Sequence, residues 1–167
     1  MICVASSNTS LSVIRAAHLL DIPRLLELAS QYQDEIVVAD KFVPVIDGEL
    51  AATNMMNTMQ SELGLALVAV EGTKVIGFLW ALVVHPVPWS HYRSADTLMF
   101  YVHPDYRGGL HGYRLLKEYK SWAEGVECDE IRLSTASGIN TDSAEGIFRR
   151  LGFTPLGTVF HIKKTKE

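Results

Sequence analysis

The sequence predicts a single domain of mixed α/β (α+β) structure, with a central twisted sheet of about six to seven mostly antiparallel strands flanked by about four helices. Two apolar runs joined by a short turn predict a hairpin in the middle of the chain. A buried strand then leads through an Arg-Gly-Gly turn into an amphipathic helix. With 167 residues, of which 48% are hydrophobic and 20% charged, the chain has the balance of one domain with a well-buried core.

The first third of the chain predicts one strand and two helices. Residues 1–12 contain a Ser-Ser-Asn-Thr-Ser run, which is typical of a flexible arm, so we expect the domain to span residues 13–167. A short strand is expected at 12–16, followed by a helix that extends from a cap at Asp21 to Tyr32 and then by a loop at 33–45. A second helix is expected at 47–59. Four of its apolar side chains are expected to face the core, namely Leu50, Met55, Met56 and Met59.

The rest of the chain alternates between strands and helices. Residues 65–70 and 75–84 predict paired strands around a turn, and the Pro-rich stretch 85–94 predicts an exposed loop. The apolar strand 97–102 precedes the glycine turn and a helix that ends near Gly125. The remaining expected elements are a strand at 130–134, a helix from Asp142 to Gly152, and a last strand or strand pair at 153–164.

Composition excludes several classes of function. A net charge of −4 and an isoelectric point near 5.8 argue against a protein that coats nucleic acid, because binding to phosphate backbones needs concentrated Lys and Arg. No segment reaches the roughly 18 to 20 apolar residues of a membrane span. Cys3 and Cys128 lack metal-ligand spacing, so we expect no metal. Without an export signal, we expect reduced thiols and a cytoplasmic location.

The segment from Tyr101 to Gly112, which reads Y-V-H-P-D-Y-R-G-G-L-H-G, is suited to binding phosphate. The first amides of a helix have no intrahelical partner, and the helix dipole adds positive potential there. Glycines let the backbone approach an anion closely, and Arg107 adds a positive charge. A turn that serves only tight packing would read similarly. The spacing matches neither the dinucleotide fingerprint nor the Walker loop.

With the turn, the helix after it and the pattern from Ala144 to Phe153, the chain resembles the Gcn5-related N-acetyltransferase (GNAT) family over nearly its whole length. The Arg-Gly-Gly-Leu form is similar to a branch associated with phages and prophages. The resemblance implies acetyl-CoA as co-substrate and direct attack of an amine on the thioester in a ternary complex. It also implies that a backbone N–H near Val102 stabilises the oxyanion. The CoA site that it implies comprises Phe100, Tyr101, Val102, Arg107, Gly108, Gly109, Leu110, His111, Gly112, Tyr113, Asn140, Ser143 and Phe148.

Three positions depart from the family pattern. Leu110 stands where the first of two family glycines usually sits, and we expect the adjacent Gly109 to supply the backbone freedom. Phe148 stands where a tyrosine commonly protonates the departing thiolate. A thiol with a pKa of roughly 8.5 leaves readily enough for water to be the proton donor. The strand 97–102 also lacks the carboxylate that often acts as the base.

The nearest candidates for the base are Asp96, His85 and His91, with Tyr101 and His103 less favoured. Each lone histidine is also compatible with a purely structural or surface position. A base is needed because an amine of the lysine type, with a pKa of about 10.4, is mostly protonated at neutral pH.

The acceptor is expected to be a small-molecule amine or a protein amine. The side chains that favour this class are in segments without core positions: Asp34, Glu35 and Asp40 for attraction of a cation, and Trp89 and Tyr92 for stacking. These acidic residues are equally compatible with a solvated surface. A basic edge strand at 160–164 makes a homodimer an expectation, and for a phage-encoded protein the location would be the host cytoplasm. The alternatives are a CoA-binding module without catalysis and a nucleotide-phosphate enzyme.

Overall fold

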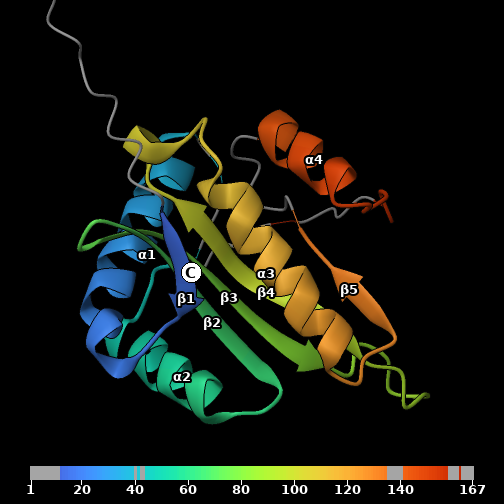
Figure 1. The fold of residues 1–167 in the computed structure, drawn as a ribbon. Helices are drawn as coiled ribbons and strands as arrows, with labels where there is room; N and C mark the ends of the chain where they lie inside the picture. Colours follow the sequence, from blue (N-terminus) through green and yellow to red (C-terminus); the bar gives the residue numbers. More distant parts are fainter. Residues whose placement is uncertain (1–11, 40, 42–43, 135–140, 158–161, 163–167) are drawn as a thin grey trace, which may run out of the picture.

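The computed structural model describes residues 12–39, 41, 44–134, 141–157 and 162. The polypeptide forms five strands, four α-helices and two short 3-10 helices over these residues. In chain order they are β1 (Val13–Ala16), η1 (Leu19–Asp21), α1 (Ile22–Val38), α2 (Gly48–Gln60), β2 (Gly64–Glu71), β3 (Lys74–Val84), β4 (Ser94–Val102), η2 (Pro104–Tyr106), α3 (His111–Gly125), β5 (Glu130–Arg132) and α4 (Thr141–Arg150) (Figure 1).

The strands form one mixed sheet in the order β1-β2-β3-β4-β5. The first four pair antiparallel, and β5 pairs parallel to β4. The hairpin predicted at residues 65–84 is confirmed, with Gly72 at a φ of 60° in its turn. The prediction of six to seven strands is wrong for the described residues, because residues 153–157 form no strand. The rest of the segment predicted as the last strand pair is outside the described residues, apart from Ile162.

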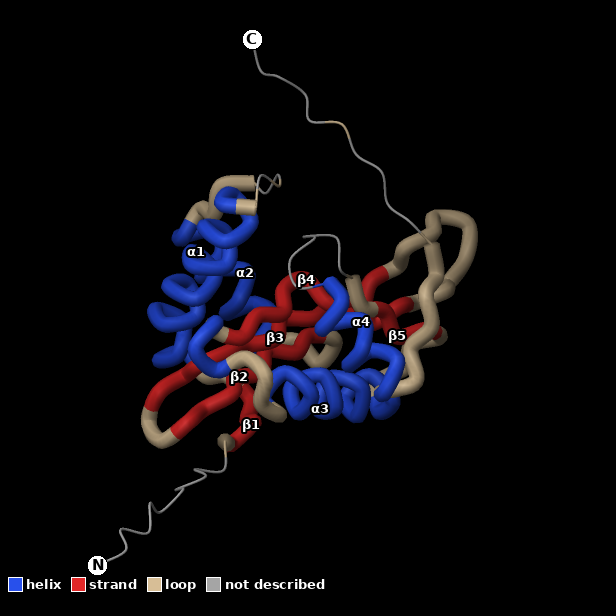
Figure 2. The backbone as a smooth tube through the Cα atoms, turned by 90° about the horizontal axis from the view of Figure 1, so that it is seen from above, coloured by secondary structure: helices blue, strands red, loops and turns tan. Residues whose placement is uncertain are grey.

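The helices cover both faces of the sheet. In the view from above, α1 and α2 lie on one side of the strands and α3 and α4 on the other (Figure 2). The core therefore divides into two clusters. One packs α1 and α2 against Val68, Phe78 and Tyr101, and the other packs α3 against Leu79 and Ala95. The sheet alternates its side chains between these two layers.

Two local predictions about the helices are corrected. The first helix continues through residue 38, so the predicted loop 33–45 is helical in its first part. Burial of Ile36 explains the extension, because it continues the helical apolar stripe of Leu25 and Leu28. In α2, Met55 is buried, whereas Leu50 and Met56 are exposed, because only a narrow stripe of this short helix contacts β2.

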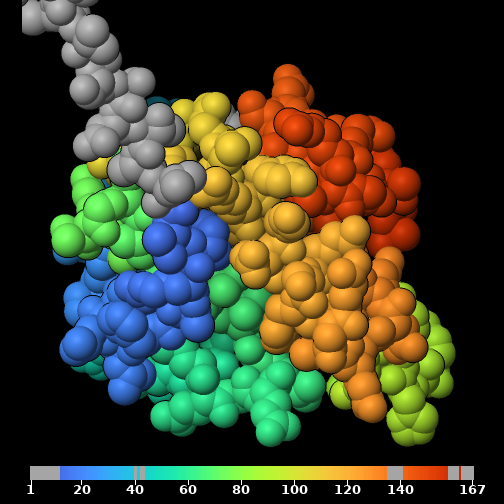
Figure 3. All heavy atoms as spheres, in the orientation of Figure 1, coloured from blue at the N-terminus to red at the C-terminus, as the bar shows by residue number. Residues whose placement is uncertain are grey.

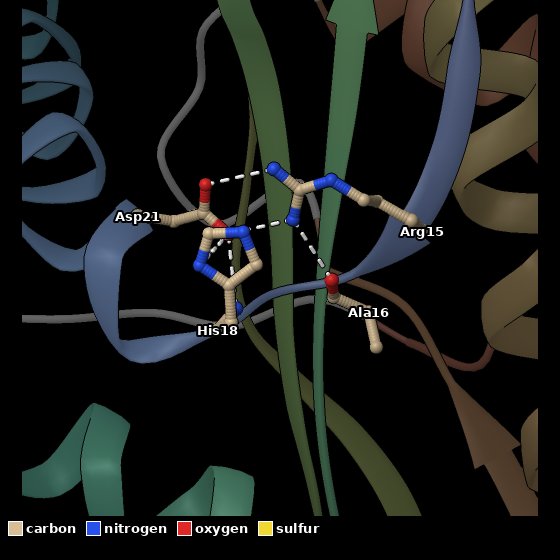
Figure 4. Close-up of polar contacts among 4 residues, drawn as sticks. All are labelled: Arg15, Ala16, His18 and Asp21. Atoms are coloured by element: carbon tan, nitrogen blue, oxygen red, sulfur yellow. Dashed lines mark hydrogen bonds and ion pairs between the residues drawn. The ribbon is translucent and has the colours of Figure 1, made fainter.

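An ion pair connects β1 to the start of α1. The guanidinium of Arg15 donates two hydrogen bonds to the buried Asp21 carboxylate, at 2.7 and 2.8 Å, and the backbone N–H of His18 donates a third at 2.9 Å (Figure 4). The hydrogen bond from Arg15 is the main reason that the pKa of Asp21 lies below its usual value, although burial opposes it. No helix in the described part of the chain is long and apolar enough to cross a membrane.

Candidate active site

The edge of β4 that faces β5 is open over most of its length. β4 pairs with β5 only up to Asp96, so residues 97–102, about 20 Å of strand, have no strand partner on that side among the described residues. Figure 1 shows the two strands diverging toward α4. Where they separate, the buried hydroxyl of Tyr119 lies 2.6 Å from the carbonyl oxygen of Ala95 and 2.8 Å from that of Arg132. The phenol on α3 therefore links the two strands at the end of their paired segment.

A β-bulge at Leu98 divides this edge into two differently oriented parts. Thr97 lies opposite Ala81 and Met99 lies opposite Trp80, so Leu98 is the extra residue. Directly opposed residues share a face of the sheet. Phe100, beside Leu79, therefore faces α3, whereas Met99 faces the layer of α1 and α2.

A cleft of about 390 Å³ opens along this free edge. It contacts both layers of the molecule, since Tyr32 of α1 and Ile147 of α4 line it together. In the space-filling view, the residues of α4 lie against the start of α3 (Figure 3). The full lining is Tyr32, Thr97, Leu98, Met99, Phe100, Val102, Tyr106, Arg107, Gly108, Gly109, Gly112, Ser134, Ser143, Ala144, Ile147 and Phe148.

At one end of the cleft, the turn before α3 presents free backbone donors. Gly108 has a φ of 83°, which permits the turn. The first backbone bond of the helix runs from the Arg114 N–H to the carbonyl of Leu110, and within the described residues the N–H groups of residues 108–113 have no acceptor. A Cβ on Gly112 would lie 3.3 Å from the Phe100 ring, so glycine lets α3 approach β4. Six unpaired amides at a helix start are suited to binding an anion.

Arg107, within the turn, is bound to α1 by an ion pair. Its Nη1 and Nη2 donate to the two carboxylate oxygens of Glu35 at 2.8 and 2.9 Å, and its Nε donates to the Val102 carbonyl at 2.7 Å. The Tyr101 hydroxyl donates to Glu35 at 2.6 Å, and the guanidinium lies over the Tyr101 ring. The positive charge of Arg107 is therefore largely neutralised by Glu35.

This network also shifts two pKa values. Burial alone raises the pKa of Glu35, but hydrogen bonds from Arg107 and Tyr101 outweigh burial and hold it below its usual value. Burial, followed by the hydrogen bond to Glu35, raises the pKa of Tyr101. At neutral pH the carboxylate is ionised and the phenol is protonated, so this set of side chains is a structural connection with no spare proton-transfer capacity.

The residues predicted at the CoA site divide into two groups. Those that line the cleft are Phe100, Val102, Arg107, Gly108, Gly109, Gly112, Ser143 and Phe148. Tyr101 directs its ring to the other layer, His111 packs against Tyr106, and neither Leu110 nor Tyr113 lines the cleft. Asn140 is outside the described residues. Their roles remain predictions.

The departure at Leu110 has a simple structural explanation. Leu110 caps α3 with a φ of −90°, a conformation that any residue adopts, and its side chain is exposed. The left-handed residue of the turn is Gly108 and not Gly109, so Gly109 could supply freedom only through its missing Cβ, which stays a prediction. The turn is therefore intact despite the missing family glycine.

The three candidates for the base lie in different places. Asp96 lines a second cavity of about 820 Å³, which shares Thr97, Ser134 and Phe148 with the first. Its Oδ1 is buried and has no hydrogen-bond partner among the described residues. His85 and His91 are exposed at the opposite end of β4 from the turn and line neither cavity.

The predicted acceptor-binding residues are also dispersed. Glu35 adjoins the site but is bound to Arg107, and Asp34 is exposed. Trp89 is 83% exposed, and the Tyr92 hydroxyl donates to Glu130 at 2.8 Å, away from the cleft. Asp40 is outside the described residues.

Sequence reasoning missed several lining residues, among them Tyr32, Leu98 and Tyr106. Tyr106 directly precedes the Arg-Gly-Gly turn, which is a usable signal. Tyr32 carries no such signal, because its helix reads as an ordinary amphipathic helix. Among the described residues, no group of three or more His, Cys, Asp or Glu side chains is arranged to hold a metal.

Comparisons with known proteins agree with this geometry. No curated protein gives a significant match to the sequence. AAC(6')-Iy, solved with the bisubstrate analogue CoA-S-monomethyl-acetylneamine, superposes with a TM-score of 0.72 at 19% identity, covering 94% of this chain and 100% of that chain. A predicted acetyltransferase from Clostridium acetobutylicum, solved with acetyl-CoA, gives 0.70 at 16% identity, covering 92% and 96%.

A third similar structure is a single-site mutant of the BH1408 protein from Bacillus halodurans, with a TM-score of 0.73 at 18% identity, covering 92% of this chain and 99% of that chain. At these identities the structures show the shared fold. The sequence model described as "Acetyltransferase (GNAT) family" matches residues 30–153, which include the whole turn and both sides of the cleft. This chain therefore belongs to the GNAT family of acetyltransferases, for which acetyl-CoA is the co-substrate.

Proposed function

We propose that the protein transfers the acetyl group of acetyl-CoA to an amine by direct attack in a ternary complex. One observation carries the proposal: the free edge of β4 leads to the six unpaired amides of residues 108–113 within a single cleft. These amides suit the pyrophosphate, and the strand edge suits the amide groups of the pantetheine arm. Two similar structures were solved with a CoA-based bisubstrate analogue and with acetyl-CoA, which supports CoA as the ligand of this cleft.

The same edge supplies the catalytic donor. Alternate residues of β4 direct their backbone N–H groups away from β3, into the cleft. A donor of this kind in the unpaired part of β4, aimed at the thioester oxygen, stabilises the developing oxyanion by roughly 3 kcal/mol. Attack by the amine then expels the thiolate, which takes a proton from solvent, because Phe148 in the cleft wall has no proton to donate.

Asp96 is the proposed base among the three candidates. Its register opposite Leu82 places it on the sheet face that also carries Met99. Its Oδ1 lacks a hydrogen-bond partner in the described part of the chain, so it is free to accept a proton from the acceptor ammonium through intervening water. It is also adjacent to Thr97, which lines both cavities.

A charge placed in the turn tests the CoA site. Gly109→Asp adds a carboxylate beside the proposed pyrophosphate at a position where a Cβ meets nothing closer than 3.4 Å. We expect acetyl-CoA affinity to fall by about tenfold or more, as for loss of a charge-assisted contact. Gly48→Asp is the matched control, because it makes the same change at the start of α2 in open space. Equal affinities for the two variants in calorimetry would rule out the turn as the anion site.

A catalytically silent CoA-binding module is the second candidate, and Phe148 favours it. The two functions differ in one assay. The enzyme releases CoA thiol only when an amine is present and yields an acetylated amine by mass spectrometry. The module binds acetyl-CoA and releases no thiol with any amine.

A further inference from the structure

We propose that the acceptor is a monoamine carried on an uncharged apolar or aromatic body, and that a polycationic acceptor is disfavoured. This inference rests on the proposed acetyl transfer and adds the chemical class of the acceptor. It follows from the charges along the acceptor side of the free β4 edge, where the side chains of Tyr32, Leu98 and Met99 line the cleft.

The position of the acceptor follows from the two faces of the edge. Ala144, Ile147 and Phe148 of α4 line the cleft on one side, where they cover the proposed path of the pantetheine arm. The nucleophile must approach the thioester from the other side. Met99 faces the layer of α1 and α2, and Tyr32 of α1 lies over that part of the cleft.

The described lining of the cleft contains no free charge at this acceptor end. Arg107 is the one charged side chain in the described lining of the first cleft, and Glu35 neutralises it through two hydrogen bonds. A cationic acceptor would have to displace Arg107 to use Glu35. The surface that remains is aromatic and aliphatic, formed by Tyr32, Leu98 and Met99.

The neighbouring cavity supplies one carboxylate and no more. Its lining holds five charged side chains, namely Asp96, Glu130, Arg132, Glu145 and Arg149. Arg132 pairs with Glu130 at 2.6 Å, and Arg149 lies 4.0 Å from Glu145. Only Asp96 is left with a buried, unpartnered carboxylate oxygen among the described residues.

One uncompensated carboxylate matches one ammonium group, which is the reacting amine. A second ammonium that packs against Tyr32 or Met99 would lose water without gaining a partner, and this loss is costly. The apolar body of a monoamine gains from the same contact. The expected preference for the monoamine therefore has two sources. A polyamine loses free energy when its second charge is desolvated, and the monoamine gains free energy when its apolar body is buried.

Three probes test this preference in the full-length protein with saturating acetyl-CoA: 2-phenylethylamine, cadaverine and kanamycin A. Thiol release gives kcat/KM, and mass spectrometry confirms that the amine is acetylated. We expect kcat/KM for 2-phenylethylamine to exceed that for kanamycin A by about tenfold or more, with cadaverine between them. An equal or higher value for kanamycin A overturns the proposal and leaves acetyl transfer intact.

Adding one negative charge at the acceptor end gives an independent test, which is read from the ratio of kcat/KM for two amines. Leu98 is 49% exposed, so Leu98→Glu adds a carboxylate without burying it. We expect the ratio of kcat/KM for cadaverine over 2-phenylethylamine to rise roughly threefold, in line with an exposed ion pair. Leu50→Glu is the matched control, because Leu50 is 60% exposed on α2 and lines neither cavity.

An unchanged ratio in Leu98→Glu, or the same rise in Leu50→Glu, shows that the acceptor does not lie at this end and overturns the proposal. If every amine fails to release thiol while calorimetry shows that acetyl-CoA binds, the proposed transfer itself is refuted. The two failures are therefore distinguishable.

Discussion

The ion pair between Arg107 and Glu35 joins the turn before α3, the proposed CoA site, to α1. Arg107→Met removes three hydrogen bonds, to two carboxylate oxygens and to the Val102 carbonyl. Among the described residues, it leaves Glu35 with only the hydrogen bond from Tyr101. The substitution therefore removes the charge partner of Glu35 and the hydrogen bond that connects the turn to the last residue of β4.

The expected magnitude follows from partial burial. The side chains of Arg107 and Glu35 are 30% and 26% exposed, so the pair lies between the surface and buried limits. We expect Arg107→Met to lower the free energy of unfolding by about 2 kcal/mol, the usual cost of losing a charged hydrogen-bond partner. With Glu35→Gln as the second arm, the coupling energy of the double-mutant cycle should be about 1.5 kcal/mol.

The assay combines urea denaturation with acetyl-CoA kinetics. The pair of Arg24 and Glu27 is the matched control, since it joins the same residue types within α1 at 2.7 Å and its glutamate is 62% exposed. Its coupling energy should be about 0.3 kcal/mol. Because Arg107 holds the strand end next to the turn, Arg107→Met should raise KM for acetyl-CoA, while Arg107→Lys recovers charge and only part of the geometry.

A coupling energy for Arg107 and Glu35 no larger than that of the control pair would refute the reasoning. An unchanged KM for acetyl-CoA in Arg107→Met would also refute it, because the turn would then keep its geometry without the hydrogen bonds of Arg107.

Three further predictions concern the scaffold. Asp21 has a lowered pKa through Arg15, so its stabilisation is present above its unfolded pKa of about 3.9 and is lost as pH falls through the lower folded value. Asp21→Asn should therefore unfold more easily at pH 7 and converge with wild type in acid, and parallel pH profiles would contradict this. Tyr119→Phe should cost about 1 kcal/mol in urea denaturation, and no change would mean that the strands diverge without its hydroxyl. Gly77→Ala should lower the free energy of unfolding by about 2 kcal/mol in urea denaturation, because its Cβ would lie 2.7 Å from the Tyr101 carbonyl oxygen. Wild-type stability in this variant would show that β4 can move to accommodate the methyl group.

Features with a local cause were readable from the sequence. The hairpin at 65–84, the helix after the glycine turn and the end of α4 at Gly152, with a φ of 90°, follow from turn residues and apolar spacing within a few positions. The end of α1 was not readable in this way. It depends on Ile36 reaching a core that forms only when α1 packs on the sheet.

The site likewise contains features with a local cause and features that depend on residues distant in the chain. The glycines and the free amides of the turn were predictable, because a strand-to-helix junction creates unpaired donors by itself. The partner of Arg107 was not, because Glu35 lies 72 residues away in the chain. Glu35 was expected to attract a cation from solution, and the structure gives it a cation from the protein instead.

The sequence by itself determined that this chain is an α/β acetyltransferase of the GNAT family with a turn before α3 whose free amides suit an anion. Tertiary structure alone decided where β4 and β5 separate, which face of the open edge each side chain occupies, and which charges remain uncompensated. The physical reason is that backbone conformation and helix ends depend on near neighbours, whereas strand divergence and charge neutralisation depend on residues far apart in the chain. Asp96 and Glu35 read alike as carboxylates in the sequence, and only packing separates an unpartnered oxygen from a paired one.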